Sequence, residues 1–394
     1  MFHALLALAL VSAVAPFEAR TLDGRTLKGS LVELSADHAT IASADGRASL
    51  DTKQLLAISR NRNETPNRHA TGLVVELMDG SVIRADQYLV HGGNARITLE
   101  GGDVLETPTS AVRTVQFQAS AEASAEWSRL LGRRADSDLL VVRAEGSLDA
   151  HQGILHDVAD DTVRFDLDGE VLAIRRSKVY GLAYRHSSAA ELPPAVCRIT
   201  DTTGSQWAAR SLTLNGKLQW VTAAGLSVSQ PLERIAEIDF SDGKLTYLSD
   251  MKPESTVWTP FFAVGKPLPA MEQFYAPRFD RGFRAGGLEL GGVPYAKGMA
   301  VHAHTKLVYH LPSGFRRFMA TVGMDDAARP NGAVRLVIRG DDRPLWDGQV
   351  SGNEAPKTID VDVAASRHLT VEVDFIGSLT AGSRLLLCNA RVVK

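Results

Sequence analysis

The chain has 394 residues, of which 44% are hydrophobic and 23% are charged, and its net charge at pH 7 is −3. These proportions are close to the globular average, so they exclude a largely disordered chain and a coiled coil, and the length predicts several domains. The charge lacks the basic surplus of a protein that binds a phosphate backbone, so we expect no nucleic-acid partner. The two cysteines, Cys197 and Cys388, are too few for a disulfide framework.

The N-terminus, residues 1–15, predicts an export signal. Residues 4–14 form an apolar run that is shorter than the roughly 20 residues needed to span a bilayer. Small residues follow where a secretory signal peptide would be cleaved. We therefore expect a secreted or periplasmic protein with no membrane span, since no later apolar stretch is long enough for one. A buried first strand or short helix is the alternative interpretation.

Four segments between residues 17 and 243 repeat one pattern. Each has a strand, a turn ending in glycine, two more strands, a second glycine turn and an apolar-x-x-apolar step. The paired turn glycines are 22, 22, 23 and 21 residues apart: Gly24 and Gly46, Gly80 and Gly102, Gly146 and Gly169, Gly204 and Gly225. The closing steps are Leu55/Ile58, Val112/Val115, Val179/Leu182 and Ile235/Ile238. This regularity predicts four copies of one small fold.

Glycine tolerates the positive φ of tight turns, so these turns between alternating apolar runs predict β-hairpins. Five short strands, with a single-turn helix before the last, describe a small β-barrel. The repeats resemble Sm-like barrels, and this resemblance concerns the fold and assigns no ligand. Some Sm-like barrels bind RNA, but the lysine and aromatic interleaving expected for that use is missing here. We expect separable barrels at residues 17–62, 70–118, 137–187 and 194–243.

A short linking helix is predicted within residues 119–136, between the second and third repeats. Alanine, glutamate and leucine favour helix here, and Trp127, Leu130 and Leu131 fall on one helical face. We expect this helix to dock on a neighbouring barrel, with Trp127 as a packing anchor rather than a ligand platform.

The pattern changes in the last third of the chain, residues 256–394. Apolar residues recur at every second position along most of residues 299–311, 334–338, 359–363 and 369–375. Such alternation is typical of strands with one covered face, and several of them predict an antiparallel β-sandwich or jelly roll. Along residues 299–311, read as one strand, His302 and His304 are expected to project from the same face.

Several motifs in this region are similar to a known family. Tyr295-Ala296-Lys297-Gly298, His302 and Leu307-Val308-Tyr309-His310-Leu311 resemble the signature of the novel putative carbohydrate-binding module (NPCBM) family, and residues 315–326, 332–341 and 344–347 are similar too. The resemblance implies a galactose-binding-like β-sandwich, found in secreted bacterial proteins and often appended to glycoside hydrolases. One feature departs from the family: residues 377–384, before the final strand, contain no carboxylate. This departure weakens the expectation of binding more than that of the fold.

A sugar site needs an aromatic face and side chains that bond to hydroxyl groups. In the stretch that resembles the family, the candidate residues are Tyr295, Lys297, His302, Asp325, Asp326, Arg329, Asn331 and Trp346. The alternative is structural. In that interpretation the aspartates form turns, Tyr295 and Lys297 hold the start of a strand, and Trp346 packs in the core.

No catalytic, metal or cofactor site is predicted. Motifs of serine hydrolases, zinc proteases and P-loop enzymes are absent, and the adjacent Asp325 and Asp326 are unsuited to flank a glycosidic bond. His302 and His304 lack a third ligand, since His310 lies too far along the same strand.

We therefore predict an exported, non-catalytic protein that binds a glycan or cell-surface polysaccharide. The alternative is a structural scaffold or protein-interaction factor of the bacterial envelope that has no glycan ligand.

Overall fold

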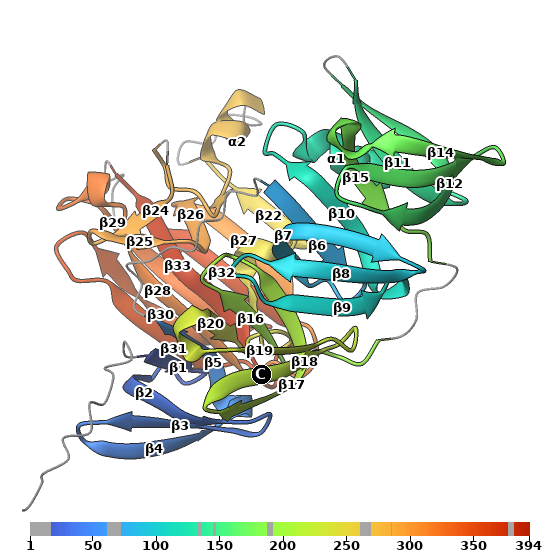
Figure 1. The fold of residues 1–394 in the computed structure, drawn as a ribbon. Helices are drawn as coiled ribbons and strands as arrows, with labels where there is room; N and C mark the ends of the chain where they lie inside the picture. Colours follow the sequence, from blue (N-terminus) through green and yellow to red (C-terminus); the bar gives the residue numbers. More distant parts are fainter. Residues whose placement is uncertain are drawn as a thin grey trace, which may run out of the picture. The chain divides into compact units, whose positions relative to one another are not determined.

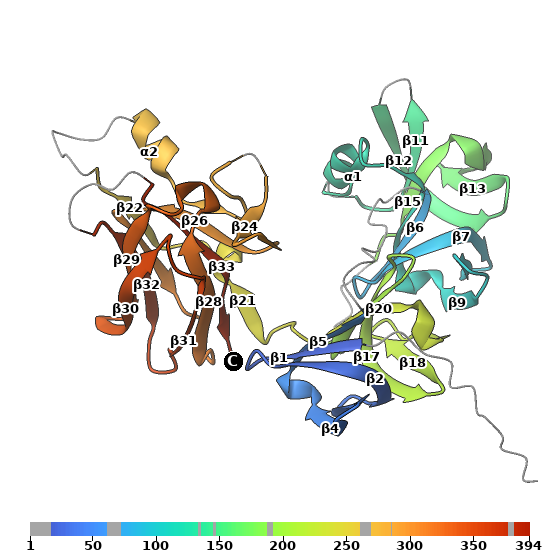
Figure 2. The same ribbon diagram turned by 90° about the vertical axis from the view of Figure 1, so that its left-hand side faces the viewer.

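The computed structural model describes residues 17–60, 72–132, 135–144, 147–186, 192–260, 269–284, 286–376 and 382–394. These residues are mostly in strands and divide into two compact units, Met1–Asp242 and Gly243–Lys394 (Figures 1 and 2). The all-β fold is confirmed. The predicted export signal and residues 377–381 of the carboxylate-free loop lie outside the described residues. Among those described, no helix is both long and apolar enough to cross a membrane.

The first unit contains four sets of five strands, and a 3-10 turn precedes each fifth strand. The strands of the first set are β1 (Phe17–Thr21), β2 (Thr26–Leu34), β3 (His38–Ser43), β4 (Gly46–Asp51) and β5 (Leu55–Arg60). Those of the second are β6 (Gly72–Leu77), β7 (Val82–His91), β8 (Asn94–Leu99), β9 (Val104–Pro108) and β10 (Val112–Ala119). Those of the third are β11 (Asp138–Ala144), β12 (Ser147–Val158), β13 (Thr162–Leu167), β14 (Glu170–Arg175) and β15 (Val179–Ala183). Those of the fourth are β16 (Cys197–Asp201), β17 (Gln206–Asn215), β18 (Lys217–Thr222), β19 (Ser227–Gln230) and β20 (Ile235–Asp239).

All four sets have the same antiparallel strand order, fifth-first-second-third-fourth. The long second strand pairs with the first strand over its N-terminal half and with the third over its C-terminal half, as β2 does on either side of Gly29 and Ser30. A register shift interrupts its pairing with the third strand in every set. Such a bulge bends a strand and increases its twist, so the sheet of each set is curved. The likeness to Sm barrels stays a prediction.

The turn glycines behave as the repeat pattern predicts. All seven that the structure describes have positive φ, from 80° at Gly80 to 125° at Gly46. Side chains other than glycine rarely adopt this conformation, which explains why glycine recurs at these positions. The turn that contains Gly146 lies outside the described residues.

The fifth strands join the repeats in pairs that do not follow chain order. β5 pairs with β20, with Ile58 opposite Ile238, and β10 pairs with β15, with Val115 opposite Leu182. Each of these four residues is the second member of its repeat's apolar-x-x-apolar step, and each is fully buried. The first repeat is therefore bound to the fourth, and the second to the third.

A reciprocal pair of serines joins the second repeat to the fourth. Ser205 Oγ accepts a hydrogen bond of 3.0 Å from the backbone N–H of Arg84, and Ser81 Oγ accepts one of 2.9 Å from that of Ala208. Each serine follows its repeat's first turn glycine, and both are buried. Buried apolar residues of all four repeats form one continuous core. The separability of the barrels and their exact boundaries stay predictions.

The linking helix forms as expected. α1 (Ser124–Leu131) buries Trp127 and Leu130 against Val141, Leu148 and Tyr180 of the third repeat. The rings of Trp127 and Tyr180 lie 5.5 Å apart. Trp127 is thus a packing residue, and the helix docks on a neighbouring repeat.

The second unit is an antiparallel β-sandwich. One sheet has the order β23 (Arg278–Phe279), β26 (Gly298–His302), β33 (Arg384–Val393), β28 (Arg317–Met324) and β31 (Lys357–Asp362), with β21 (Leu245–Tyr247) also beside β33. The other has the order β22 (Ser255–Trp258), β27 (Thr305–His310), β32 (His368–Asp374), β29 (Ala333–Gly340) and β30 (Arg343–Ser351). A separate hairpin is formed by β24 (Leu288–Leu290) and β25 (Val293–Tyr295). We call these layers the β26 sheet and the β27 sheet; their apolar faces share one core.

Three features of the sandwich differ from the sequence prediction. The sandwich begins at β21, before residue 256, because residues 245–247 pair with β33. Residues 299–311 form two strands in different sheets, since the chain turns at His304, where φ is 61°. A second short helix, α2 (Pro269–Tyr275), lies beside β22 and β26 at one end of the sandwich (Figures 1 and 2).

Candidate functional site

Aromatic rings from three segments gather around His302, at the end of β26. Trp258 of β22 and Tyr275 of α2 are stacked, with ring centroids 4.3 Å apart and planes 5° from parallel. The His302 ring lies 4.9 Å from that of Tyr275, 4.6 Å from that of Phe283 and 6.1 Å from that of Phe274. Phe274 is 60% exposed, so the group reaches the surface. We call these five residues the His302 cluster.

Two arginines border the cluster. The guanidinium groups of Arg278 and Arg384 lie 5.8 Å and 5.7 Å from the ring centroid of Phe283, within the range of cation–π attraction. Arg278 also donates hydrogen bonds to the carbonyl oxygens of Gly282 and Phe283, which holds this loop in place. Positive charge therefore stands beside an aromatic surface.

The surroundings of His302 keep its imidazole neutral. Burial, together with the positive charges of Arg384 and Arg278, lowers the pKa of His302 from 6.5 to about 4. A neutral imidazole has one N–H donor and one acceptor nitrogen. At neutral pH this side chain can thus both donate to and accept from a hydroxyl group.

Asp325 lies next to the same edge of the β26 sheet. Its backbone N–H donates to the carbonyl oxygen of Arg384, which is the direct partner of His302 on β33. The carboxylate is buried, and its Oδ2 lies 3.5 Å from Arg384 Nε without accepting a hydrogen bond from any described residue. An oxygen in this state has capacity for a further donor, since burying it unsatisfied costs free energy.

Tyr295 and Lys297 lie in structural positions. Tyr295 packs with Leu288 and Cys388 on the outer side of the β26 sheet, and burial raises the pKa of its hydroxyl. Lys297 forms ion pairs with Asp250 and Asp280, with 2.9 Å to the second, and these partners raise the pKa of its ammonium group. The lysine therefore anchors the start of β26.

Asp326 and Trp346 are likewise engaged in the fold. The Asp326 carboxylate accepts hydrogen bonds of 3.1 and 3.2 Å from the backbone N–H groups of Gly291 and Gly292, at the turn of the β24–β25 hairpin. Trp346, on the edge strand β30, is half-buried against the sandwich core. Among the described residues, His302 and Asp325 are both in contact with Arg384, whereas Asp326 holds the turn of the hairpin that contains Tyr295.

The four other aromatic residues of the cluster were not among the predicted site residues, because they lie outside the sequence motif of the family. One signal was available: residues 274–283 contain four aromatic residues in ten, Phe274, Tyr275, Phe279 and Phe283. Neither periodicity nor turn chemistry explains that density, which is typical of an aromatic surface.

His302 and His304 do not form a chelating pair. Because the chain turns between the sheets, His304 pairs instead with Asp374, with 2.9 Å between Nε2 and Oδ1, and its Nδ1 lies 3.1 Å from the carbonyl oxygen of Thr259. The strand face that the sequence pattern predicted for both histidines does not exist.

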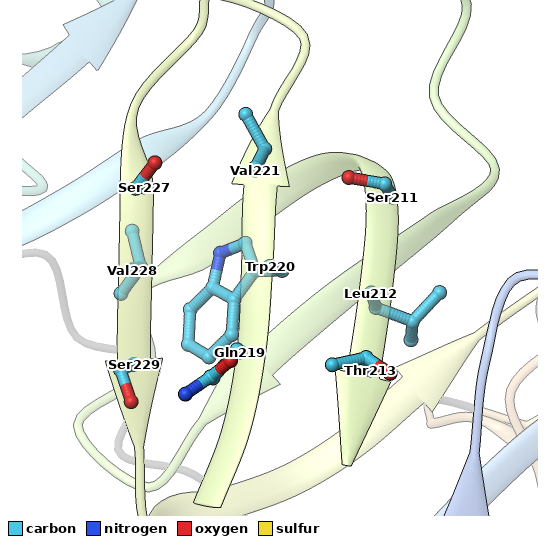
Figure 3. Close-up of a pocket in the computed structure, with 9 residues that line it drawn as sticks. All are labelled: Ser211, Leu212, Thr213, Gln219, Trp220, Val221, Ser227, Val228 and Ser229. Carbon is cyan, nitrogen blue, oxygen red and sulfur yellow. The ribbon is translucent and has the colours of Figure 1, made fainter. Parts of the chain in front are cut away.

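The first unit contains shallow hollows. One of about 450 Å³ lies on the fourth repeat, over β17, β18 and β19 (Figure 3). Its lining residues are Ser211, Leu212, Thr213, Gln219, Trp220, Val221, Ser227, Val228 and Ser229. None of these is ionisable, so this hollow lacks the groups needed for acid–base chemistry.

Comparison with known proteins gives one family match, located in the second unit, and similarity to segments of two enzymes. Residues 245–393 match the family model of the NPCBM/NEW2 domain. A 92-residue segment is 32% identical to a putative endo-alpha-N-acetylgalactosaminidase of Renibacterium salmoninarum, and a 102-residue segment is 31% identical to alpha-1,3-galactosidase B of Akkermansia muciniphila. The segments cover 23% and 25% of this chain but only 6% and 13% of these relatives, so the chain spans a small part of their length.

Solved structures with similarity to the chain include two from Clostridium perfringens. The CBM51 module of a GH95 protein, in complex with methyl-galactose, is 21% identical, with a TM-score of 0.32, over 38% of this chain and 99% of that one. The CBM51-2 and INT domains of ZmpB, with GlcNAc, are 18% identical, with a TM-score of 0.32, over 46% of this chain and 37% of that one. From the family match and the sequence motifs, the sandwich over residues 245–393 is identified as an NPCBM/NEW2 domain.

Proposed function

We propose that this protein is an exported, non-catalytic glycan-binding factor that holds a sugar at the His302 cluster. The observation that carries the proposal is the exposed aromatic face of Phe274 beside the neutral imidazole of His302. Sugar rings stack their C–H faces on aromatic rings, while fixed polar groups bond to their hydroxyls. The cluster combines both features.

The polar groups around the rings suit hydroxyl recognition. His302 offers a donor and an acceptor. Asp325 Oδ2 is buried beside Arg384 without a hydrogen bond from the described residues, so it can serve a hydroxyl group once its side chain turns outward. A bond between a hydroxyl and a charged group is about twice as strong as one between neutral groups. The two enzymes with matching segments are named for galactose and N-acetylgalactosamine linkages. Glycans ending in these sugars are therefore the ligand class that we propose.

The arrangement of the carboxylates supports a non-catalytic role. Glycoside hydrolysis by the usual route needs two carboxyl groups on opposite sides of the scissile bond. Asp326 is adjacent to Asp325 in sequence, but both of its oxygens accept hydrogen bonds from the β24–β25 turn. Because its oxygens are occupied in this way, Asp326 cannot act with Asp325 as the second catalytic carboxyl group.

Binding by the full chain to glycans ending in galactose or N-acetylgalactosamine, measured by calorimetry, tests the proposal. We expect Phe274→Ala to weaken binding about tenfold or more, which corresponds to about 1.4 kcal/mol. His302→Gln should weaken it as well. Phe274 is exposed, so its removal should leave the melting temperature unchanged.

Ile154→Ala is the matched control, because Ile154 is a 55% exposed apolar residue of the first unit. It should bind as the wild type does. Equal affinity of the wild type, Phe274→Ala and His302→Gln would show that the cluster is not the site. A wild-type protein that binds none of these glycans contradicts the proposed function and favours the scaffold alternative.

A further inference from the structure

Three side chains that commonly bind metals meet on the outer face of the β27 sheet. His310 ends β27 and His368 begins β32, and the two residues are direct partners across the strands. Glu254 precedes β22, and its backbone N–H donates a 2.8 Å hydrogen bond to the carbonyl oxygen of Val308 on β27. Hydrogen bonds between neighbouring strands thus fix the backbone of all three residues, and none of the three residues lies in a long loop.

The ligand atoms lie close together. Glu254 Oε2 is 3.4 Å from His368 Nε2, and Glu254 Oε1 is 3.9 Å from His310 Nδ1. One ligand atom from each residue lies within 4.8 Å of the other two. Zinc bonds of about 2.0–2.2 Å place tetrahedral ligands roughly 3.4 Å apart. Small side-chain rotations at this exposed position are enough to reach that spacing.

A second carboxylate orients one of the two imidazoles. Asp341 Oδ1 lies 3.4 Å from His368 Nδ1 and accepts a 3.0 Å hydrogen bond from the backbone N–H of the same residue. It thereby turns His368 Nε2 toward Glu254. Histidines that bind metals usually bond through their other nitrogen to such a group, which fixes the tautomer and the ring orientation.

We propose that Glu254, His310 and His368 bind a divalent transition-metal ion of the zinc class, with Asp341 as the group that positions His368. Two imidazoles and one carboxylate suit Zn²⁺, Ni²⁺ or Cu²⁺, whereas Ca²⁺ and Mg²⁺ prefer sites made of oxygen ligands. Three protein ligands leave a coordination position for water or for a group from a partner. The site shares no residue with the His302 cluster and does not depend on the proposed glycan binding.

Zn²⁺ binding to the tag-free full chain, measured by calorimetry and by metal content after dialysis, tests this site. We expect one Zn²⁺ per chain that Ca²⁺ does not displace. His310→Gln, His368→Gln and Glu254→Gln should each abolish that stoichiometry. Asp341→Asn should weaken the affinity by about 10–100-fold, the usual cost of losing the partner of a metal-binding histidine.

His91→Gln is the control, because His91 lies in the first unit with a side chain 98% exposed. It should bind Zn²⁺ as the wild type does, and so should Phe274→Ala, whatever its effect on glycans. Melting temperatures in chelator should show that each variant is folded. Zn²⁺ content that stays at one per chain in folded His310→Gln or Glu254→Gln, or a wild type that takes up none, overturns the proposal.

Discussion

At the scale of single residues, neighbours in sequence have different roles. Asp325 is buried with an oxygen that accepts no hydrogen bond from the described residues, while Asp326 secures the turn of a hairpin about 35 residues earlier in the chain. Backbone geometry causes the difference, because Asp325 directly follows β28, whereas Asp326 begins a 3-10 turn. The identity of the residue alone does not separate these roles.

The pKa of His302 gives a prediction at this scale. The midpoint of its imidazole titration, followed by NMR, should lie near pH 4 rather than 6.5, because burial and two arginines disfavour the charged form. Since the folded pKa is the lower one, the unfolded state takes up a proton first as the pH falls. His302 therefore contributes its full stabilisation above about pH 6.5 and loses it between about pH 6.5 and 4.

Urea unfolding at pH 7 and at pH 5 provides the measurement of that stability. His302→Gln cannot titrate, so its free energy of unfolding should fall less between these two pH values than that of the wild type. A His302 midpoint at or above pH 6.5 would contradict the buried environment described for the ring.

At the scale of elements, the first unit repeats one connection scheme and then joins the copies by edge pairing. The fifth strand of each repeat exposes backbone groups that a single copy leaves without partners. Pairing β5 with β20 and β10 with β15 satisfies them. In each pair the last residue of one apolar-x-x-apolar step lies opposite the last residue of another, so the same sequence pattern forms both junctions.

Ser81 and Ser205 allow a test of the junction between the second and fourth repeats. Ser81→Ala and Ser205→Ala should each lower the free energy of unfolding by about 1–3 kcal/mol, because each leaves a buried backbone N–H without its acceptor. The exposed Ser227→Ala should have little effect. Chemical denaturation of the three variants is the measurement, and a loss at Ser81 no greater than at Ser227 would show that this contact contributes nothing.

At the scale of the whole molecule, the chain has two compact units with separate cores. We expect calorimetry to show two unfolding transitions rather than five, because the four repeats share one core. Ile238→Ala should lower one transition and Leu336→Ala the other, since each removes a fully buried side chain, at a cost of about 2–5 kcal/mol. Independent melting of single repeats would instead support separable barrels.

The sequence by itself determined what depends on local chemistry. Turn glycines, period-two alternation and the helical face of Trp127 predicted the repeats, the all-β fold and the docked helix, because these signals act within a few residues. The motif from Tyr295 to Leu311 identified the family of the second unit through direct similarity. Part of the candidate site was also predicted, namely His302 and Asp325.

Only the tertiary structure decided which distant segments meet. Alternation continues through Ala303 and His304 although the chain passes from one sheet to the other there, because both strands cover the same core. No local pattern in the sequence indicates that the first repeat pairs with the fourth. Tyr275 and Phe283 reach His302 from separate segments, and Trp258 of a third segment stacks on Tyr275. His310 meets His368 across a separation of 58 positions. Such contacts depend on strand order and sheet packing, which local sequence patterns do not encode.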